Sequence, residues 1–212
     1  NYSASFALGF ILSLYLQYVK GMDARHAGFI LMIQPIVQTV FSPLTGRFSD
    51  KINPSIMTTS GMAIITIALV VLSGIDPETS IVFISIVMAA VGFGFALFSS
   101  PNVNIIMGSV QKRFYGLASA TTGTARLIGQ AMSLAIATMA IHAHMGDEKM
   151  SVENSDLFLA SMKTAFFIFA ALCAAGVYTS GSKIIGKYAK EDWRAHSQRM
   201  SARLHADADE SK

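Results

Sequence analysis

The stretch GLASATTGTARLIGQAMSLAIATMAIH, residues 116–142, is long and apolar enough to cross a bilayer, yet it carries one arginine. At about 1.5 Å of helix per residue, Arg126 lies roughly 15 Å from the start of the stretch, close to mid-membrane. A charge at that depth costs at least about 2.5–3.5 kcal/mol, so the side chain must face protein or water. Polar residues spaced by three and four share its helical face: Ser119, Thr122, Gln130 and Ser133. Such a polar face requires other spans to close around it.

The composition supports a membrane protein. The chain is 52% hydrophobic and 14% charged, whereas soluble domains carry about 25% charge. Soluble core helices, the alternative, rarely contain charge-free runs of this length. The single cysteine, Cys173, lies in an apolar run and predicts neither a disulfide nor a metal site. A formal charge of +3 is too small to indicate a nucleic-acid partner, and we expect no cofactor.

Six spans are predicted, so the fold class is an all-α integral membrane bundle of six transmembrane helices. The bundle takes up residues 1–182, and residues 183–212 form a basic tail. The first span is short at its start, as if the chain began inside it. The predicted spans are residues 5–19, 27–45, 55–74, 80–99, 116–142 and 157–181.

Basic residues are distributed unequally between the two sides that these spans define. The loops 20–26, 75–79 and 143–156 hold three bases, whereas the loops 46–54 and 100–115 together with the tail hold eleven. Positive residues gather on the cytoplasmic side of multi-pass proteins. We therefore expect a plasma-membrane (inner-membrane) protein with both termini of this segment in the cytoplasm. Lys183–Lys190 with Trp193 either lie on an anionic leaflet or belong to a disordered tail.

The spans differ in character, and the difference recurs in each group of three. The second span has its own polar face, made by Gln34, Gln38, Ser42 and Thr45, and Pro35 is expected to kink it or to free a backbone carbonyl. The third and sixth spans are largely apolar. This pattern predicts a three-plus-three inverted repeat in which spans two and five line a central cavity and spans three and six face lipid. Gly92 and Gly94 are expected to permit close helix packing rather than to bind a dinucleotide.

Two segments carry a resemblance to a known family. The loop PLTGRFSDKINP (43–54) resembles a cytoplasmic signature loop of the major facilitator superfamily, with Asn53 in place of a usual glycine and Ser55 in place of a usual base. The segments GFGFALFSSPNVNIIMGSV (92–110) and FYGLASATTGTARLIGQAMS (114–133) resemble the penultimate pair of spans of that superfamily. Over residues 6–182 the likeness is closest to the fourteen-span drug:proton antiporters of the QacA and EmrB kind. It implies the C-terminal half of a transporter whose N-terminal half is missing from this sequence.

The resemblance and the polar faces together suggest two groups of site residues. Substrate is expected to meet a cavity lined by Gln34, Gln38, Thr122, Arg126 and Gln130. Arg126 matches an arginine common in the family; it either binds an anionic group, a partner carboxylate or backbone carbonyls, or is a packing arginine without a substrate role. The glutamines and Thr122 either contact substrate or bond between helices. The signature loop implies a cytoplasmic gate formed by Gly46, Arg47, Asp50 and Lys51.

The function expected from these features is secondary active transport, namely proton-coupled export of drug-like or amphipathic compounds by alternating access. The alternatives are a metabolite or siderophore transporter of the same fold and a six-span scaffold that transports nothing. No Asp or Glu lies inside any predicted span, so a proton-carrying carboxylate is expected in the missing half. No catalytic constellation is apparent, which argues against an enzyme. His142 and His144 form a weak HxH pattern that could bind metal or sense pH, although ordinary interface residues explain it better.

Overall fold

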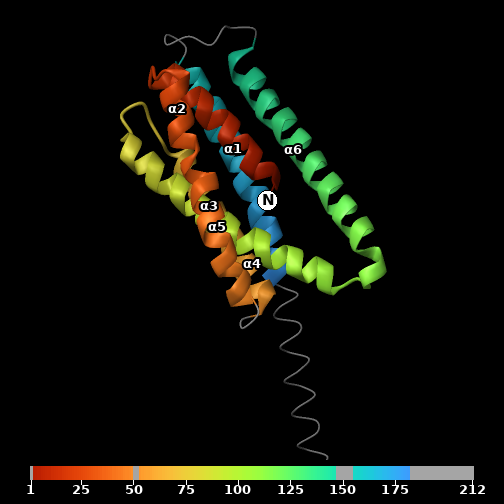
Figure 1. Cartoon of the computed structure of the whole chain (residues 1–212). Helices are drawn as coiled ribbons and strands as arrows, with labels where there is room; N and C mark the ends of the chain where they lie inside the picture. The colour runs from red at the N-terminus through yellow and green to blue at the C-terminus, as the bar shows by residue number, and fades with distance from the viewer. Residues whose placement is uncertain (1, 50–52, 147–154, 182–212) are drawn as a thin grey trace, which may run out of the picture.

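Every regular element in the described residues, 2–49, 53–146 and 155–181, is helical in the computed structural model. Six helical segments are long and apolar enough to cross a membrane. The sixth, Ser155–Gly181, has no label in Figure 1 and is called the last helix below. The other elements are α1 (Tyr2–Leu14), η1 (a π-helical turn, Tyr15–Val19), α2 (Ala24–Leu31), α3 (Ile33–Ser49), α4 (Pro54–Ser73), α5 (Ile81–Gly108), η2 (Lys112–Phe114) and α6 (Tyr115–Met145).

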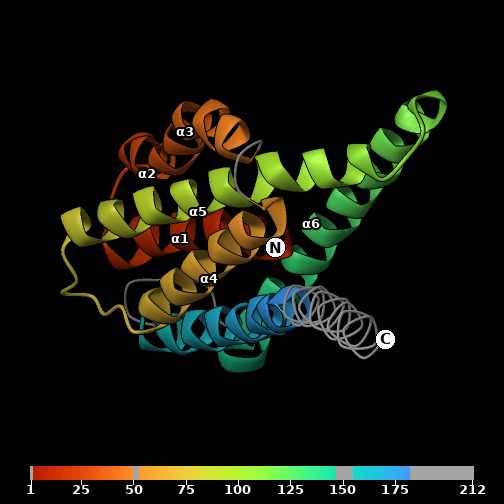
Figure 2. The same cartoon turned by 90° about the horizontal axis from the view of Figure 1, so that it is seen from below.

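Five of the six segments form a compact group, whereas α6 lies along one side of it (Figure 1). Viewed from below, the end of α5 and the start of α6 extend together away from the other helices (Figure 2). α4 and α3 pack along α5, and α6 packs against α1. The buried side chains form one continuous apolar cluster that extends from α1 through α4 and α5 to the last helix. The all-helical six-span fold predicted from the sequence is therefore confirmed.

The connections alternate between two ends of the bundle, as the predicted topology requires (Figure 1). The end of α3, the start of α4, the turn between α5 and α6 and the end of the last helix lie at one end, here called the inner end. The η1–α2 connection, the α4–α5 loop and the end of α6 lie at the other, the outer end. The loops that are rich in bases lie at the inner end, and the positive-inside rule therefore predicts that this end faces the cytoplasm. This orientation stays a prediction from charge.

Glycines allow the backbones of α3, α4 and α5 to approach closely. A Cβ on Gly61 of α4 would lie 2.5 Å from the carbonyl oxygen of Gly94 in α5, and one on Gly92 would collide with the carbonyl oxygen of Gln34. Backbone atoms cannot move aside as a flexible side chain can, so these positions exclude larger residues. The predicted packing role of Gly92 and Gly94 is confirmed.

Several predicted boundaries were wrong. α5 does not end at residue 99 but continues through Pro101 to Gly108, so most of the predicted loop 100–115 is helical. The polar run around Asn102 resembles a loop in composition, but a proline within a membrane helix removes a single backbone bond that neighbours can compensate. α3 likewise continues into the predicted loop 46–54 and ends at Ser49. The predicted tail, residues 183–212, lies outside the described residues.

The predicted kink in the second span is present as a break between α2 and α3. Met32 is the single residue between the two helices, and Pro35 lies in the first turn of α3. Because proline has no N–H, the carbonyl of Leu31 lacks its usual helical donor four residues on. The break therefore falls one turn before the proline, as the chemistry of proline predicts.

The middle span of each predicted triplet packs against the first span of the other triplet. α3 packs against α5, and α6 packs against α1. This exchange favours the predicted three-plus-three repeat. The same two middle spans, α2–α3 and α6, have the least buried membrane windows of the six. The spans with polar faces are thus those that the bundle itself covers least.

Candidate functional site

The two halves of α6 have different surroundings. Its buried residues, Ser133, Ala137, Ala140 and Met145, all belong to the half near the outer end, and the helix packs against α1. From Tyr115 to Met132, α6 has no buried residue. The small side chains Ala137 and Ala140 permit close approach to α1, while the inner half of α6 stands apart from the bundle.

Arg126 lies in the exposed half of α6 and is paired with Tyr2, the first residue of α1. Its guanidinium group donates from Nη2 to the phenolic oxygen of Tyr2 at 3.1 Å, and its Cζ lies 4.5 Å from the centre of the Tyr2 ring. No ion pair joins Arg126 to a carboxylate among the residues that the structure describes. The arginine is therefore held by a hydrogen bond and a cation–π contact, which together offset part of the cost of placing it in the membrane.

A cavity of about 920 Å³ opens beside this pair, between the inner halves of α5 and α6. Its lining includes Tyr2 of α1, Phe98 and Asn102 of α5, and Thr122 and Arg126 of α6. Phe114, at the turn that joins α5 to α6, also contributes. Tyr2 and Phe98 contact each other edge to face, with ring centres 5.9 Å apart. The volume is in the range of sites that hold drug-sized molecules.

The lining of this cavity is apolar and aromatic, with few hydrogen-bond donors. Arg126 is its one charged residue among those the structure places there. The hydroxyl groups of Ser109, Thr121 and Thr122 donate to backbone carbonyls of their own helices. In this arrangement they can accept a hydrogen bond from a ligand. The other side-chain donors in the lining are the guanidinium group, the phenolic O–H of Tyr2 and the amides of Asn102 and Gln111.

The sequence model of the Major Facilitator Superfamily matches residues 1–134, more than half of the chain. The chain belongs to the major facilitator superfamily. It is 22% identical over 176 residues to the riboflavin transporter RibZ of Clostridioides difficile, which is 83% of this chain and 39% of RibZ. It is 29% identical over 166 residues to the uncharacterized transporter YebQ of Escherichia coli, covering 78% of this chain and 35% of YebQ. Multidrug resistance protein 3 of Bacillus subtilis matches at 27% over 129 residues, 61% of this chain and 25% of that protein.

These comparisons establish a multi-pass membrane protein of a transporter superfamily. The chain spans less than half the length of each of these relatives. The expected family resemblance is thus confirmed at the level of the superfamily.

The other predicted cavity residues of this superfamily member are dispersed. Thr122 lines the main cavity with Arg126, whereas Gln130 lines a second cavity of about 460 Å³ between α1, α2 and α6. The Gln34 side chain donates to the Ser5 hydroxyl group at 3.4 Å, so it bonds between α3 and α1. Gln34 and Gln38 line neither cavity. Tyr2 borders both cavities. Of the five predicted residues, Thr122, Arg126 and Gln130 therefore line cavities that meet at Tyr2.

Thr45 is the buried position on the polar face of α3. Thr45 is 3% exposed, and its hydroxyl group lies 2.9 Å from the carbonyl oxygen of Ala96 in α5. In the predicted gating loop, a Cβ on Gly46 would lie 3.0 Å from the Ser100 hydroxyl oxygen of α5, while Arg47 is exposed. Asp50 and Lys51 lie outside the described residues. Their gating role stays a prediction.

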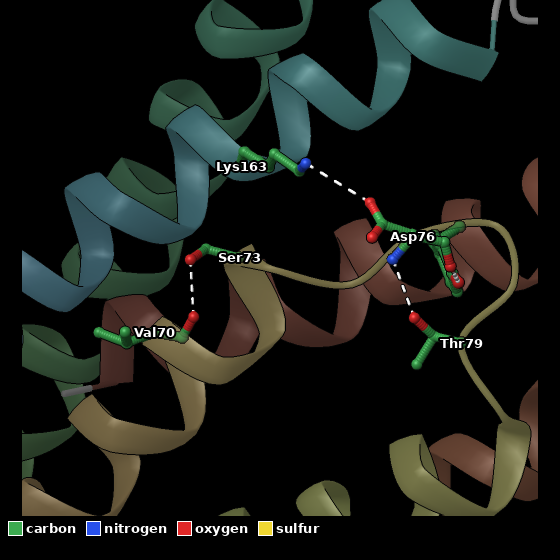
Figure 3. Close-up of polar contacts among 6 residues, drawn as sticks. Val70, Ser73, Asp76, Thr79 and Lys163 are labelled. Atoms are coloured by element: carbon green, nitrogen blue, oxygen red, sulfur yellow. Dashed lines mark hydrogen bonds and ion pairs between the residues drawn. The ribbon is translucent and has the colours of Figure 1, made fainter.

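A cluster of polar contacts joins three elements at the outer end. Asp76, in the α4–α5 loop, accepts at its backbone carbonyl from the Tyr15 hydroxyl group at 2.7 Å, and its carboxylate lies 3.6 Å from Nζ of Lys163 in the last helix (Figure 3). The backbone N–H of Asp76 donates to Thr79, and Lys20 donates to the carbonyl of Pro77. These contacts hold the outer ends of α1, the α4–α5 loop and the last helix together.

The two histidines near the outer end of α6 bond to protein groups. Nδ1 of His142 lies 3.1 Å from the carbonyl oxygen of Gly146, and Nδ1 of His144 lies 3.1 Å from that of Ala140. Nε2 of His144 is 3.3 Å from the Thr164 hydroxyl group of the last helix. No cluster of three metal ligands occurs among the described residues. These contacts agree with the reading of both histidines as interface residues.

Sequence reasoning did not find Tyr2 as the partner of Arg126, nor the two phenylalanines that line the same cavity. Tyr2 lies before the start of the predicted first span, and Phe98 and Phe114 belong to a predicted span and a predicted loop that precede the span of Arg126. Their meeting depends on how α1, α5 and α6 converge at the inner end. The energetic cost of a single arginine in a membrane span predicted that it has partners, but it did not predict which residues they are.

Proposed function

We propose that this chain is the C-terminal six-helix half of a secondary transporter that exports drug-like or amphipathic compounds in exchange for protons. The substrate enters the cavity beside Arg126, and this bundle rocks against an N-terminal bundle during alternating access. Arg126, Thr122 and Gln130 contact the substrate, while Gln34 and Gln38 bond between helices or meet the substrate in another conformation. The observation that carries the proposal is the large apolar cavity at the inner end, lined in part by the half of α6 that has no buried residue.

Two of the relatives support the export of drug-like compounds. Multidrug resistance protein 3 and the lincomycin resistance protein LmrB of Bacillus subtilis bear names of resistance proteins, and LmrB is 26% identical over 68% of this chain. The fourteen-span antiporter branch belongs to the same proposal. The partner half is inferred from the length of the relatives, of which this chain spans 39% or less in the three compared above.

Proton coupling is placed in the partner half. No Asp or Glu lies within the six predicted spans, and the described acids Asp23, Asp76, Glu78 and Asp156 belong to loops or helix ends at the outer end. A proton-carrying group must lie in the transport pathway. A purified fragment of residues 1–212 that moved protons together with substrate in liposomes would overturn this placement.

A metabolite transporter is the second candidate function. It is favoured by the riboflavin transporter RibZ, which matches 83% of this chain. The same cavity serves either candidate, because an aromatic lining accepts both drugs and ring-containing metabolites.

The test is transport by the protein expressed from its complete reading frame and reconstituted in liposomes. With an imposed pH gradient, chloramphenicol, a neutral drug-like compound, is expected to accumulate against its concentration gradient and dissipate the pH difference. Accumulation of riboflavin but not chloramphenicol supports the second candidate. A protein that moves neither compound, or moves them without any proton flux, contradicts the proposed proton-coupled export.

Cysteine labelling tests the position of the site. In a background with Cys173 replaced by alanine, cysteines at positions 122, 126 and 130 are expected to react with a water-soluble maleimide. Positions 128 and 135 serve as controls, because they lie on other faces of α6 and are expected to meet lipid or protein. Equal reaction at both sets rules out a water-filled cavity along the Arg126 face.

A further inference from the structure

The chemistry of the main cavity points to the charge and shape of its ligand. We propose that this cavity binds planar aromatic compounds that carry a negative charge, with Arg126 as the counter-charge, and that it discriminates against organic cations. The inference rests on the proposed function for the identity of the site and adds the substrate class.

The described lining of the cavity is positively charged. Arg126 is the one charged residue among the described residues around the cavity. The acids that the structure describes lie at the outer end, whereas this cavity lies at the inner end, beside the turn that carries Lys112 and Arg113. The positive-inside bias accounts for Lys112 and Arg113, but it does not account for a base within the span. The described lining of the cavity therefore carries a net positive charge, which attracts anions and repels cations.

Arg126 can donate further hydrogen bonds besides the one to Tyr2. A guanidinium group carries five N–H donors in a planar fork. Among the described residues, one of its hydrogen bonds is directed to Tyr2. This partner is a neutral phenol, so it leaves the positive charge uncompensated. A carboxylate or sulfonate in the cavity can accept a bidentate pair of hydrogen bonds from the same group.

The apolar part of the cavity lining is rich in aromatic rings. Tyr2, Phe98 and Phe114 line the cavity from three different elements, and Tyr2 and Phe98 already contact each other edge to face. Tyr2 also holds Arg126 against its ring face. A flat aromatic ligand can stack on these rings while its anionic group reaches Arg126. The hydroxyl groups of Thr121 and Thr122 donate to their own helix, so they can accept a hydrogen bond from uncharged donors on the ligand.

A matched set of naphthalene compounds tests the proposal directly. Radiolabelled 2-naphthoate, the neutral 2-naphthamide and the cationic 2-naphthylmethylammonium share ring and size and differ in charge. Their binding is measured by equilibrium dialysis on the complete protein in lipid nanodiscs. We expect the anion to bind at least about tenfold more tightly than the cation, the scale of a charge-assisted hydrogen bond. The neutral amide is expected to lie between them.

Substitutions then assign the preference to Arg126. Arg126→Gln is expected to abolish the preference for the anion, whereas Arg126→Lys retains part of it because it keeps the charge without the planar fork. Arg25→Gln is the matched control, because Arg25 also lies over an aromatic ring, that of Phe29 at 5.9 Å, but outside the cavity. It is expected to leave all three affinities unchanged.

Equal binding of the three compounds by the unmodified protein, or tighter binding of the cation, overturns the proposal without any variant. A preference for the anion that survives in Arg126→Gln overturns the role of Arg126. These outcomes are separate from the fate of the proposed function. A protein that transports chloramphenicol but shows no anion preference refutes only this inference, whereas anion-selective binding without any transport refutes only the proposed function.

Discussion

The α3–α4–α5 side and the α6 side of this bundle are built in opposite ways. On the first side, Gly61, Gly92 and Gly94 bring helix backbones so close that a single methyl group would collide. On the second side, Gly116 and Gly123 of α6 have open space around them, and the inner half of that helix has no buried residue. We call the closely packed helices α3, α4 and α5 the frame and the inner half of α6 the wall of the cavity. Close backbone packing fixes the frame, while the uncovered half of α6 leaves room for a ligand and for a partner bundle.

The largest effect is expected from adding one methyl group to the frame. Gly61→Ala places a Cβ 2.5 Å from the Gly94 carbonyl oxygen and close to the Phe98 N–H, so α4 and α5 must separate. We expect a loss of about 1–3 kcal/mol of stability. Thermal unfolding in detergent micelles measures this loss as a lower midpoint. The matched variant on the other side, Gly123→Ala, meets no atom within 4 Å and is expected to leave the midpoint unchanged or raise it slightly. Equal losses in the two variants would erase the distinction between frame and wall.

A smaller effect is expected from one buried hydroxyl group in the frame. Thr45→Val removes the bond between Thr45 and the Ala96 carbonyl while keeping the shape of the side chain. Interhelical hydrogen bonds in membrane proteins contribute about 0.6 kcal/mol on average, so we expect a small decrease in the same unfolding midpoint. Thr39→Val is the control, since Thr39 is exposed and bonds within its own helix to the carbonyl of Pro35. A larger loss in Thr39→Val than in Thr45→Val would contradict the packing role of the polar face of α3.

The smallest effect is expected at the outer end, where the frame meets the last helix. Lys163→Gln removes the ion pair with Asp76, whose side chains are 44% and 66% exposed. Exposed ion pairs contribute at most about 1 kcal/mol and are screened by salt. The difference between variant and unmodified protein should therefore shrink when unfolding is measured in high salt. A difference that persists at high salt would indicate that Lys163 acts through packing of its aliphatic chain.

The sequence predicted the elements well because their signals are local. Six apolar runs, the break before Pro35 and the unequal distribution of bases each depend on residues that are neighbours along the chain. The end of α5 was missed because a proline and several polar residues resemble a loop, although the membrane and neighbouring helices sustain the helix past Pro101. Local composition carries no information about that support.

Three of the five predicted cavity residues, Arg126, Thr122 and Gln130, line one of the two cavities. They were predicted because a charge and a polar stripe inside an apolar run are costly and can be seen within one helix. Gln34 and Gln38 have the same appearance in sequence, yet they line neither cavity. Helical periodicity shows which residues share a face but not which neighbour that face meets.

The sequence by itself determined that this is a six-span helical membrane protein with a costly arginine in its fifth span. It did so because hydrophobic length and the energy of a charge in lipid act on each segment separately. Only the tertiary structure decided that Arg126 is held by Tyr2, that Phe98 and Phe114 join them, and that no described carboxylate neutralises the cavity. These facts arise from the convergence of α1, α5 and α6, in which the contact between Tyr2 and Arg126 joins residues 124 positions apart in the chain.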